Sequence, residues 1–109
     1  MIIDFNSIPV TVVPNMRGGE KEVHLRKFEN DLGKIMRGKL IPGASIGMHV
    51  HETSSEVIYI LAGQGKVLYE GEYLPLTAGT THYCPKGMGH SLINDSDADL
   101  EFLAIIPEQ

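Results

Sequence analysis

Residues 43–63 read GASIGMHVHETSSEVIYILAG, and this stretch decides the fold. It holds His49, His51 and Glu56 between two glycines, within a run of alternating and apolar residues. Side chains alternate along an extended strand, so histidines at positions i and i+2 point to the same face. On a helix they would be separated by about 200° and could not bind one ion. The stretch therefore predicts a strand that presents two imidazoles to one face, with Glu56 on the next strand and a metal ion bound between them.

A second stretch with histidines, GTTHYCPKGMGHSLIN, occupies residues 79–94. Together the two stretches resemble the cupin superfamily. The first cupin motif, G-x5-H-x-H-x3/4-E-x6-G, is matched by Gly43, His49, His51, Glu56 and Gly63. The second, G-x5-P-x-G-x2-H-x3-N, is matched by Gly79, Pro85, Gly87, His90 and Asn94. The 15 residues between the motifs are similar to the short spacing of small single-domain cupins.

The resemblance implies a divalent metal held by the family's usual ligands, which here are His49, His51, Glu56 and His90. Three imidazoles and one carboxylate suit Mn, Fe, Co, Ni, Cu or Zn, and the ligand set alone does not choose among them. Four protein ligands on a six-coordinate ion leave two positions for water, substrate or dioxygen. The alternative is a cupin scaffold whose site is empty or structural. Asn94 is expected to be a turn residue and not a ligand, and the motif glycines are expected where φ is positive or backbones cross closely.

The chain as a whole predicts an all-β protein. Short apolar segments alternate with turn signals, and no long segment carries apolar residues at helical spacing. This pattern indicates a sandwich or barrel, and the cupin resemblance implies a jelly-roll β-barrel (a double-stranded β-helix). We expect one domain over residues 1–109, with an N-terminal arm and edge strands in residues 1–30 and the barrel in residues 31–107. The arm would add a strand to the sheet or to a partner subunit.

The later part of the chain reads as a series of hairpins. One is expected between residues 57–62 and 66–69, with Gly63, Gln64 and Gly65 as its tight turn. Others follow at Glu70-Gly71 and at residues 77–79.

Composition narrows the functional classes. The formal net charge is -5 and no cluster of lysine or arginine occurs, which argues against nucleic acid and anionic membranes as partners. The single cysteine, Cys84, cannot form an internal disulfide, so a reducing compartment is expected. The N-terminal residues lack the pattern of a signal peptide, and no apolar segment reaches the roughly 20 residues of a membrane span. We therefore expect a cytoplasmic protein.

Four residues outside the motif ligands are weaker candidates for function. His82 and Cys84 lie two apart, so they share a strand face, and His82 could act as a general acid or base near the metal. Arg37 and Lys39 likewise share a face and could clamp a substrate carboxylate. For each pair the alternative is an ordinary structural or solvated role, and Cys84 is expected to be a buried small residue.

The strand after Glu56 is apolar on both faces. Period two places Ile58 and Ile60 toward the ligands and Val57, Tyr59 and Leu61 on the opposite face. An apolar outer face is usually covered, which predicts a homodimer. In the last strand the residues expected to point inward are Leu100, Phe102, Ala104 and Ile106. They give an apolar pocket wall, which suits a small organic ligand.

Two functions follow from the cupin resemblance. The first is a metal-dependent enzyme acting on a small oxygen-rich or carboxylate substrate, of the dioxygenase, decarboxylase, lyase or isomerase type. The alternative is a non-catalytic module that binds or senses a small molecule.

Overall fold

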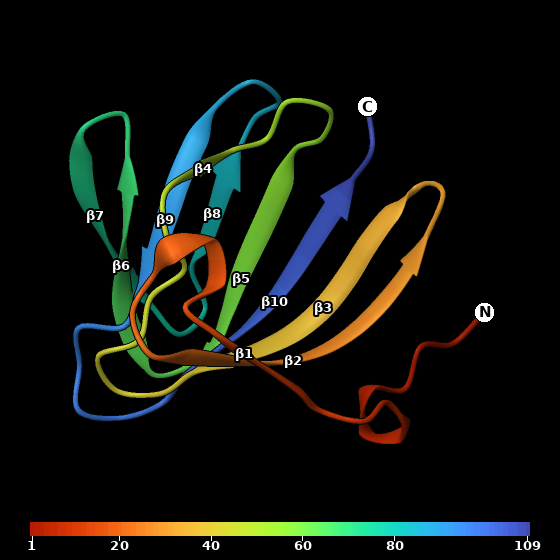
Figure 1. Ribbon diagram of the computed structural model, residues 1–109, viewed down its shortest axis with the longest axis horizontal. Helices are drawn as coiled ribbons and strands as arrows, with labels where there is room; N and C mark the ends of the chain where they lie inside the picture. The colour runs from red at the N-terminus through yellow and green to blue at the C-terminus, as the bar shows by residue number, and fades with distance from the viewer.

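The computed structural model describes residues 1–109 as two antiparallel sheets that enclose one core (Figure 1). The six-stranded sheet contains, in spatial order, β1 (Thr11–Pro14), β2 (Glu22–Asn30), β3 (Gly33–Leu40), β10 (Leu100–Pro107), β5 (Glu56–Ala62) and β8 (Thr81–Cys84). The four-stranded sheet contains β4 (His49–Val50), β9 (Gly89–Ile93), β6 (Gln64–Tyr69) and β7 (Glu72–Thr77). The helical elements are two single turns, η1 (Phe5–Ser7) and η2 (Met16–Gly18). No helix has the length and apolar character needed to cross a membrane. The predicted all-β fold is confirmed.

The chain passes repeatedly from one sheet to the other. The predicted hairpin around Gly63 was wrong, because β5 and β6 belong to different sheets and do not pair. The turn chemistry was read correctly, since Gly63 has φ 84°, but a turn does not determine which strands pair. β5 pairs instead with β10 and β8, and β6 pairs with β9 and β7. The turn at residues 77–79 also connects the two sheets, whereas the hairpin at Glu70-Gly71 is confirmed.

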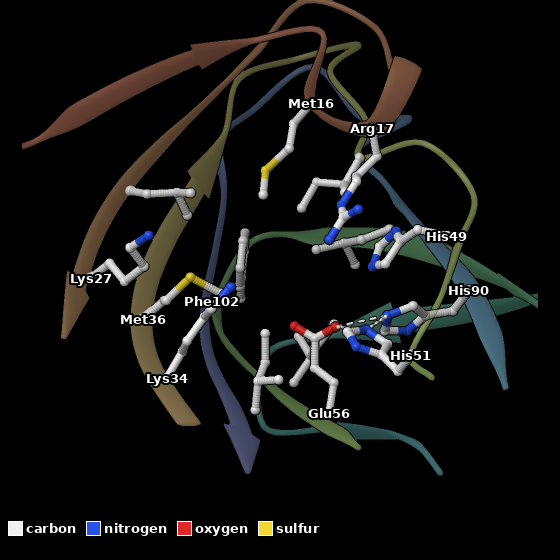
Figure 2. A pocket seen from close by; sticks show the side chains of 15 residues that line it. Met16, Arg17, Lys27, Lys34, Met36, His49, His51, Glu56, His90 and Phe102 are labelled. Atoms are coloured by element: carbon white, nitrogen blue, oxygen red, sulfur yellow. Dashed lines mark hydrogen bonds and ion pairs between the residues drawn. The ribbon is translucent and has the colours of Figure 1, made fainter. Parts of the chain in front are cut away.

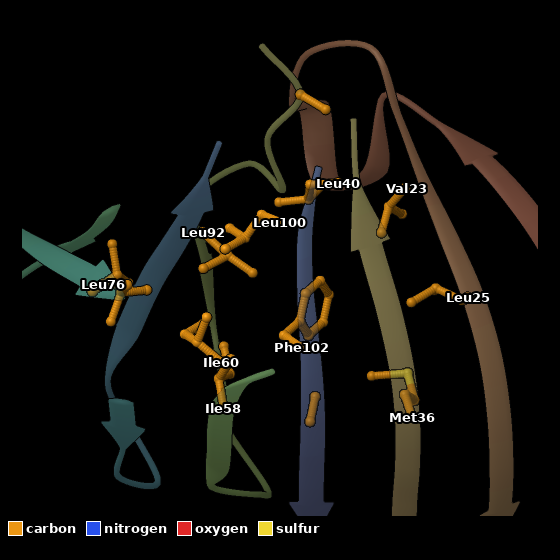
Figure 3. Close-up of a cluster of buried hydrophobic side chains, with 13 residues drawn as sticks. Val23, Leu25, Met36, Leu40, Ile58, Ile60, Leu76, Leu92, Leu100 and Phe102 are labelled. Atoms are coloured by element: carbon orange, nitrogen blue, oxygen red, sulfur yellow. The ribbon is translucent and has the colours of Figure 1, made fainter. Parts of the chain in front are cut away.

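The core lies between the inner faces of the two sheets and contains 13 buried side chains (Figure 3). In β10, Leu100, Phe102 and Ala104 are buried as predicted, and Ile106 packs at the edge of this cluster. Phe102 lies at the centre and faces Gly38, where a β-carbon would overlap the phenyl ring. The alternation in β5 is also confirmed, because Ile58 and Ile60 are buried while Tyr59 and Leu61 are about 40% exposed (41% and 39%).

The N-terminal arm lies against the chain's own barrel. β1 extends the six-stranded sheet by pairing with β2, from Thr11 opposite Leu25 to Pro14 opposite Glu22. The following turn, residues 15–20, then packs on the segment that leads into β4, through hydrogen bonds of Glu20 with Ser45 and of Met16 with Gly47. Motif glycines Gly43, Gly63, Gly79 and Gly87 have φ between 80° and 90°, as expected.

Candidate metal centre

The two sheets bring four potential metal ligands to one place inside the barrel. His49 lies on β4 and pairs directly with His90 on β9, so both imidazoles come from the four-stranded sheet. His51 follows β4 with its side chain on the same face as His49, because Val50 between them points to solvent. Glu56 begins β5 in the six-stranded sheet and meets the histidines from across the barrel (Figure 2).

The donor atoms of these four residues lie within 4.8 Å of one another. Glu56 Oε1 is 2.7 Å from His90 Nε2 and 3.0 Å from His51 Nε2, and the two Nε2 atoms are 3.0 Å apart. The three imidazole centroids are mutually separated by 4.9 to 5.0 Å. His51, Glu56 and His90 are buried and His49 is half-buried, so the cluster is largely withdrawn from solvent.

Hydrogen bonds outside the cluster fix which ring nitrogen of each histidine can bind a metal. His49 Nδ1 lies 2.7 Å from the Gly47 carbonyl oxygen, which can only accept, so Nδ1 carries the proton and Nε2 keeps its lone pair. His51 Nδ1 is 3.2 Å from Ser54 Oγ, and His90 Nδ1 is 3.0 Å from His82 Nε2. All three Nδ1 atoms therefore have an outer partner. In proteins that bind transition metals, a hydrogen bond at one ring nitrogen commonly orients the other nitrogen toward the ion. The three histidines therefore fit a transition-metal ion.

The charge states of Glu56 and His49 also suit a cation. Burial alone would raise the pKa of Glu56, but in the metal-free protein hydrogen bonds from His51 Nε2 and His90 Nε2 outweigh it and bring that pKa to about 2. These bonds need a proton on each Nε2, and a bound metal ion would displace those protons and take their place beside the carboxylate. Burial lowers the pKa of His49, against the opposing effect of the bond to Gly47. A carboxylate that is ionised and an imidazole that is neutral at pH 7 are the forms that bind metal ions.

His82 and Cys84 share the inner face of β8, as their spacing predicted. His82 does not line the cavity described below. It lies behind His90 and contacts the nitrogen that points away from Glu56. Burial, followed by the charge of His90, lowers the pKa of His82 to about 4, so the ring is neutral and can accept the His90 Nδ1 proton. Burial raises the pKa of Cys84 to about 11, which makes it an inert thiol at neutral pH.

A cavity of about 90 Å³ opens above the cluster. Its walls are mainly apolar and include Leu25, Ile58 and Phe102. The polar residues that line it besides the four clustered ones are all cationic. They are Arg17, Lys27 and Lys34.

Arg37 and Lys39 share a face, as their spacing predicted, but this face points away from the four clustered residues, as the solvated-face alternative has it. Both residues lie on the outer face of the six-stranded sheet, because Met36, Gly38 and Leu40 occupy the inner face of β3. Arg37 pairs there with Glu101 at 3.5 Å, and Lys39 lies 3.9 Å from Asp99.

The sequence analysis did not identify the three cationic residues that line the cavity, Arg17, Lys27 and Lys34. A signal existed for two of them, because period two puts Lys27 on the face of Val23 and Leu25. Lys34 likewise shares the inner face of β3 with Met36. No local pattern could have placed Arg17, which comes from the turn of the N-terminal arm.

Comparison with known proteins agrees with this geometry. The family model described as "Cupin domain" matches residues 36–106, and the chain belongs to this family. It is 39% identical over 112 residues to the oxalate-binding protein of Thermotoga maritima, covering 97% of this chain and 93% of the relative. The crystal structure of a predicted oxalate decarboxylase from Thermotoga maritima superposes with a TM-score of 0.94 at 35% identity, over 100% of both chains.

A more distant structure shows how widely the fold is shared. The polyketide cyclase RemF from Streptomyces resistomycificus has a TM-score of 0.81 at 22% identity, covering 98% of this chain and 78% of the cyclase. This likeness concerns the fold alone. The predicted cupin fold is confirmed by these matches.

Proposed function

We propose that the protein binds a divalent transition metal through His49, His51, Glu56 and His90, and that this centre holds a small carboxylate of the oxalate class. One observation carries the proposal: four donor atoms converge at the floor of a small cavity whose remaining polar residues are all cations. A bound divalent ion would supply a positive charge and polarise a coordinated oxygen. The names of the Thermotoga relatives, an oxalate-binding protein and a predicted oxalate decarboxylase, support the choice of ligand.

The chain's own residues would bind the anion in three ways. The apolar walls exclude water from the floor of the cavity and so strengthen charge interactions beside the buried donor residues, whereas the three cations lie at its more exposed side. Lys27 and Lys34 lie on the inner face of β2 and β3 and supply ammonium groups, each close to the carboxylate of Glu29 (3.5 and 3.7 Å). Arg17 adds a guanidinium from the arm. The small cavity suits a small molecule such as a short dicarboxylate.

Metal analysis combined with calorimetry tests this proposal. Protein purified without added metal should contain close to one equivalent of transition metal by mass spectrometry, and oxalate should bind to the loaded form and not to the metal-free form. His51→Ala should lower metal occupancy strongly. His24→Ala is the matched control, since His24 lies outside the cluster and bonds only to Glu22 (2.7 Å). Wild-type protein that takes up no transition metal, or binds oxalate equally without it, contradicts the proposal.

A second candidate function is decarboxylation, and one observation favours it. Breaking the carbon–carbon bond of oxalate releases carbon dioxide, and the remaining carbon must then take up one proton to give formate. Lys27 and Lys34 are cavity residues outside the metal cluster that carry a transferable proton. ¹³C NMR of labelled oxalate with the metal-loaded protein separates the two functions. Formate produced in many equivalents per protein indicates turnover, whereas saturable binding without formate indicates a binding module.

A further inference from the structure

The turn formed by residues 15–20 is fixed against the segment that leads into β4, the strand of His49. The Ser45 amide donates to the Glu20 carbonyl and the Gly47 amide donates to the Met16 carbonyl, both at 3.0 Å. The backbones approach so closely that a β-carbon on Gly47 would overlap the carbonyl oxygen of Arg17. Gly47 comes two residues before His49 in the sequence. The turn is therefore held directly beside the cavity.

Arg17, within this turn, has an unusual backbone conformation. Its φ and ψ are 56° and 27°, in the left-handed region that residues with a β-carbon rarely adopt. Such conformations persist where the surrounding structure imposes them, and they concentrate at functional sites. Figure 2 shows the result of this geometry: the Arg17 side chain extends from η2 into the cavity beside His49, while Lys27 and Lys34 lie on the other side.

The Arg17 guanidinium has no hydrogen-bond or ion-pair partner within the chain. The other two arginines do, since Arg26 donates to the carbonyls of Phe5 and Ile8, and Arg37 pairs with Glu101. The two cavity lysines are also partly neutralised, because both lie near Glu29. Arg17 is thus the uncompensated cation of the cavity, and its planar fork of N–H donors is free.

We propose that Arg17 is a specificity-determining residue that binds the second carboxylate of the ligand through two parallel N–H donors. This proposal rests on the proposed function, in which the metal centre holds the first carboxylate. A guanidinium fork matches the two oxygens of a carboxylate better than an ammonium does, so the contact carries direction as well as charge. The site should therefore prefer a short dicarboxylate over a monocarboxylate, and the preference depends on the arm.

Arg17→Gly tests the proposal without stressing the fold. Glycine accepts a positive φ freely, so the substitution removes the guanidinium while the turn keeps its shape. Lys21→Gly is the matched control, because Lys21 also has a positive φ (54°) and the same charge, but its ammonium bonds to Pro42 and does not line the cavity. Arg17→Lys keeps the charge and removes the fork.

The measurement is calorimetric titration of each metal-loaded protein with oxalate and, separately, with acetate, with the bound metal assayed before and after. Losing a charge-assisted pair of hydrogen bonds should weaken oxalate binding by about 10- to 100-fold in Arg17→Gly. Arg17→Lys should fall between this variant and the wild type. Acetate affinity, metal content and melting temperature should stay near the wild-type values, and Lys21→Gly should bind oxalate normally.

The outcomes separate this proposal from the one on which it depends. If the wild type binds oxalate and Arg17→Gly binds it equally well, the role of Arg17 is overturned while the metal-dependent function stands. If the affinities for oxalate and acetate fall by the same factor, Arg17 does not select dicarboxylates. If the wild-type protein, loaded with metal, binds no oxalate, both proposals are overturned.

Discussion

The contact between His82 and His90 makes a sharp prediction about metal affinity. His82 Nε2 lies 3.0 Å from His90 Nδ1, and the two side chains are 6% and 1% exposed. A neutral His82 ring can accept the proton of His90 Nδ1, and this favours the tautomer in which His90 Nε2 keeps its lone pair for a metal ion. His82→Leu removes this acceptor and fills a similar volume with apolar atoms.

The expected magnitude follows from the burial of the pair. Water cannot easily replace the lost acceptor, so the His90 N–H is left unsatisfied, at a cost of about 1–3 kcal/mol. Loss of an outer partner of a metal-binding histidine typically weakens metal affinity by about 10- to 100-fold, or about 1.4–2.8 kcal/mol. We expect the variant to fall within this range. His82→Gln should recover part of the loss, because its amide oxygen can accept from His90.

Competition with a chromophoric chelator measures the affinity directly. His24→Leu, a histidine-to-leucine change outside the cluster, is the control and should leave the affinity unchanged. Urea denaturation of the metal-free proteins shows separately how much of the effect is loss of folding stability. An affinity in His82→Leu equal to that of the wild type would refute the reasoning, as would a Gln variant no better than the Leu variant.

Three further predictions concern the fold and its surroundings. Gly47→Ala places a methyl group against the carbonyl of Arg17 and should lower the free energy of unfolding by about 1–3 kcal/mol in urea denaturation. The pKa of His82 is about 4 in the folded protein against an ordinary value of 6.5, and that of His49 is also lowered, so the unfolded chain binds more protons between these values. The metal-free protein should therefore lose stability as pH falls from 6.5 toward 4, and an unfolding free energy that is constant over this range would contradict the assignment. The apolar outer face around Tyr59, which is 41% exposed, should mediate a homodimer. Sedimentation velocity should then detect dimers in the wild type and monomers in Tyr59→Lys.

The four clustered residues could be predicted from the sequence partly through local geometry and partly through the cupin resemblance. The pair His49 and His51 needs only the alternation of a strand, and the two cupin motifs fix the positions of Glu56 and His90 relative to that strand. The inner and outer faces of β5 and β10 followed from the same alternation, since each strand carries a continuous apolar face.

Alternation was not sufficient where both faces of a strand carry polar residues. It showed that Arg37 and Lys39 share a face, but the choice of the inner face depends on packing against other strands. The Phe102 ring in β10 fills the space over Gly38 on the inner face of β3. Arg37 and Lys39, on either side of Gly38, therefore point to the outer face. The partners of β5 could not be predicted either, because they also depend on strands that are distant in the sequence. β10 and β8, which come later in the chain, occupy the two edges of β5, and this excludes a hairpin between β5 and β6.

The choice of ligand depends on residues that lie outside the motif. A polyketide cyclase shares this fold at 22% identity, so the barrel itself does not select a ligand. Within the cavity, the four clustered residues could hold a divalent cation, and they offer only one negative charge to it, that of Glu56. The other charges in the cavity are positive. Lys27 and Lys34 both lie near the carboxylate of Glu29, whereas Arg17 has no ion-pair partner in the chain. Because Arg17 is supplied by a turn that packs on the barrel through backbone contacts, its side chain could change without disturbing the donors. The same metal centre could then accept a different anion, which is why we place selectivity in the arm and metal binding in the barrel.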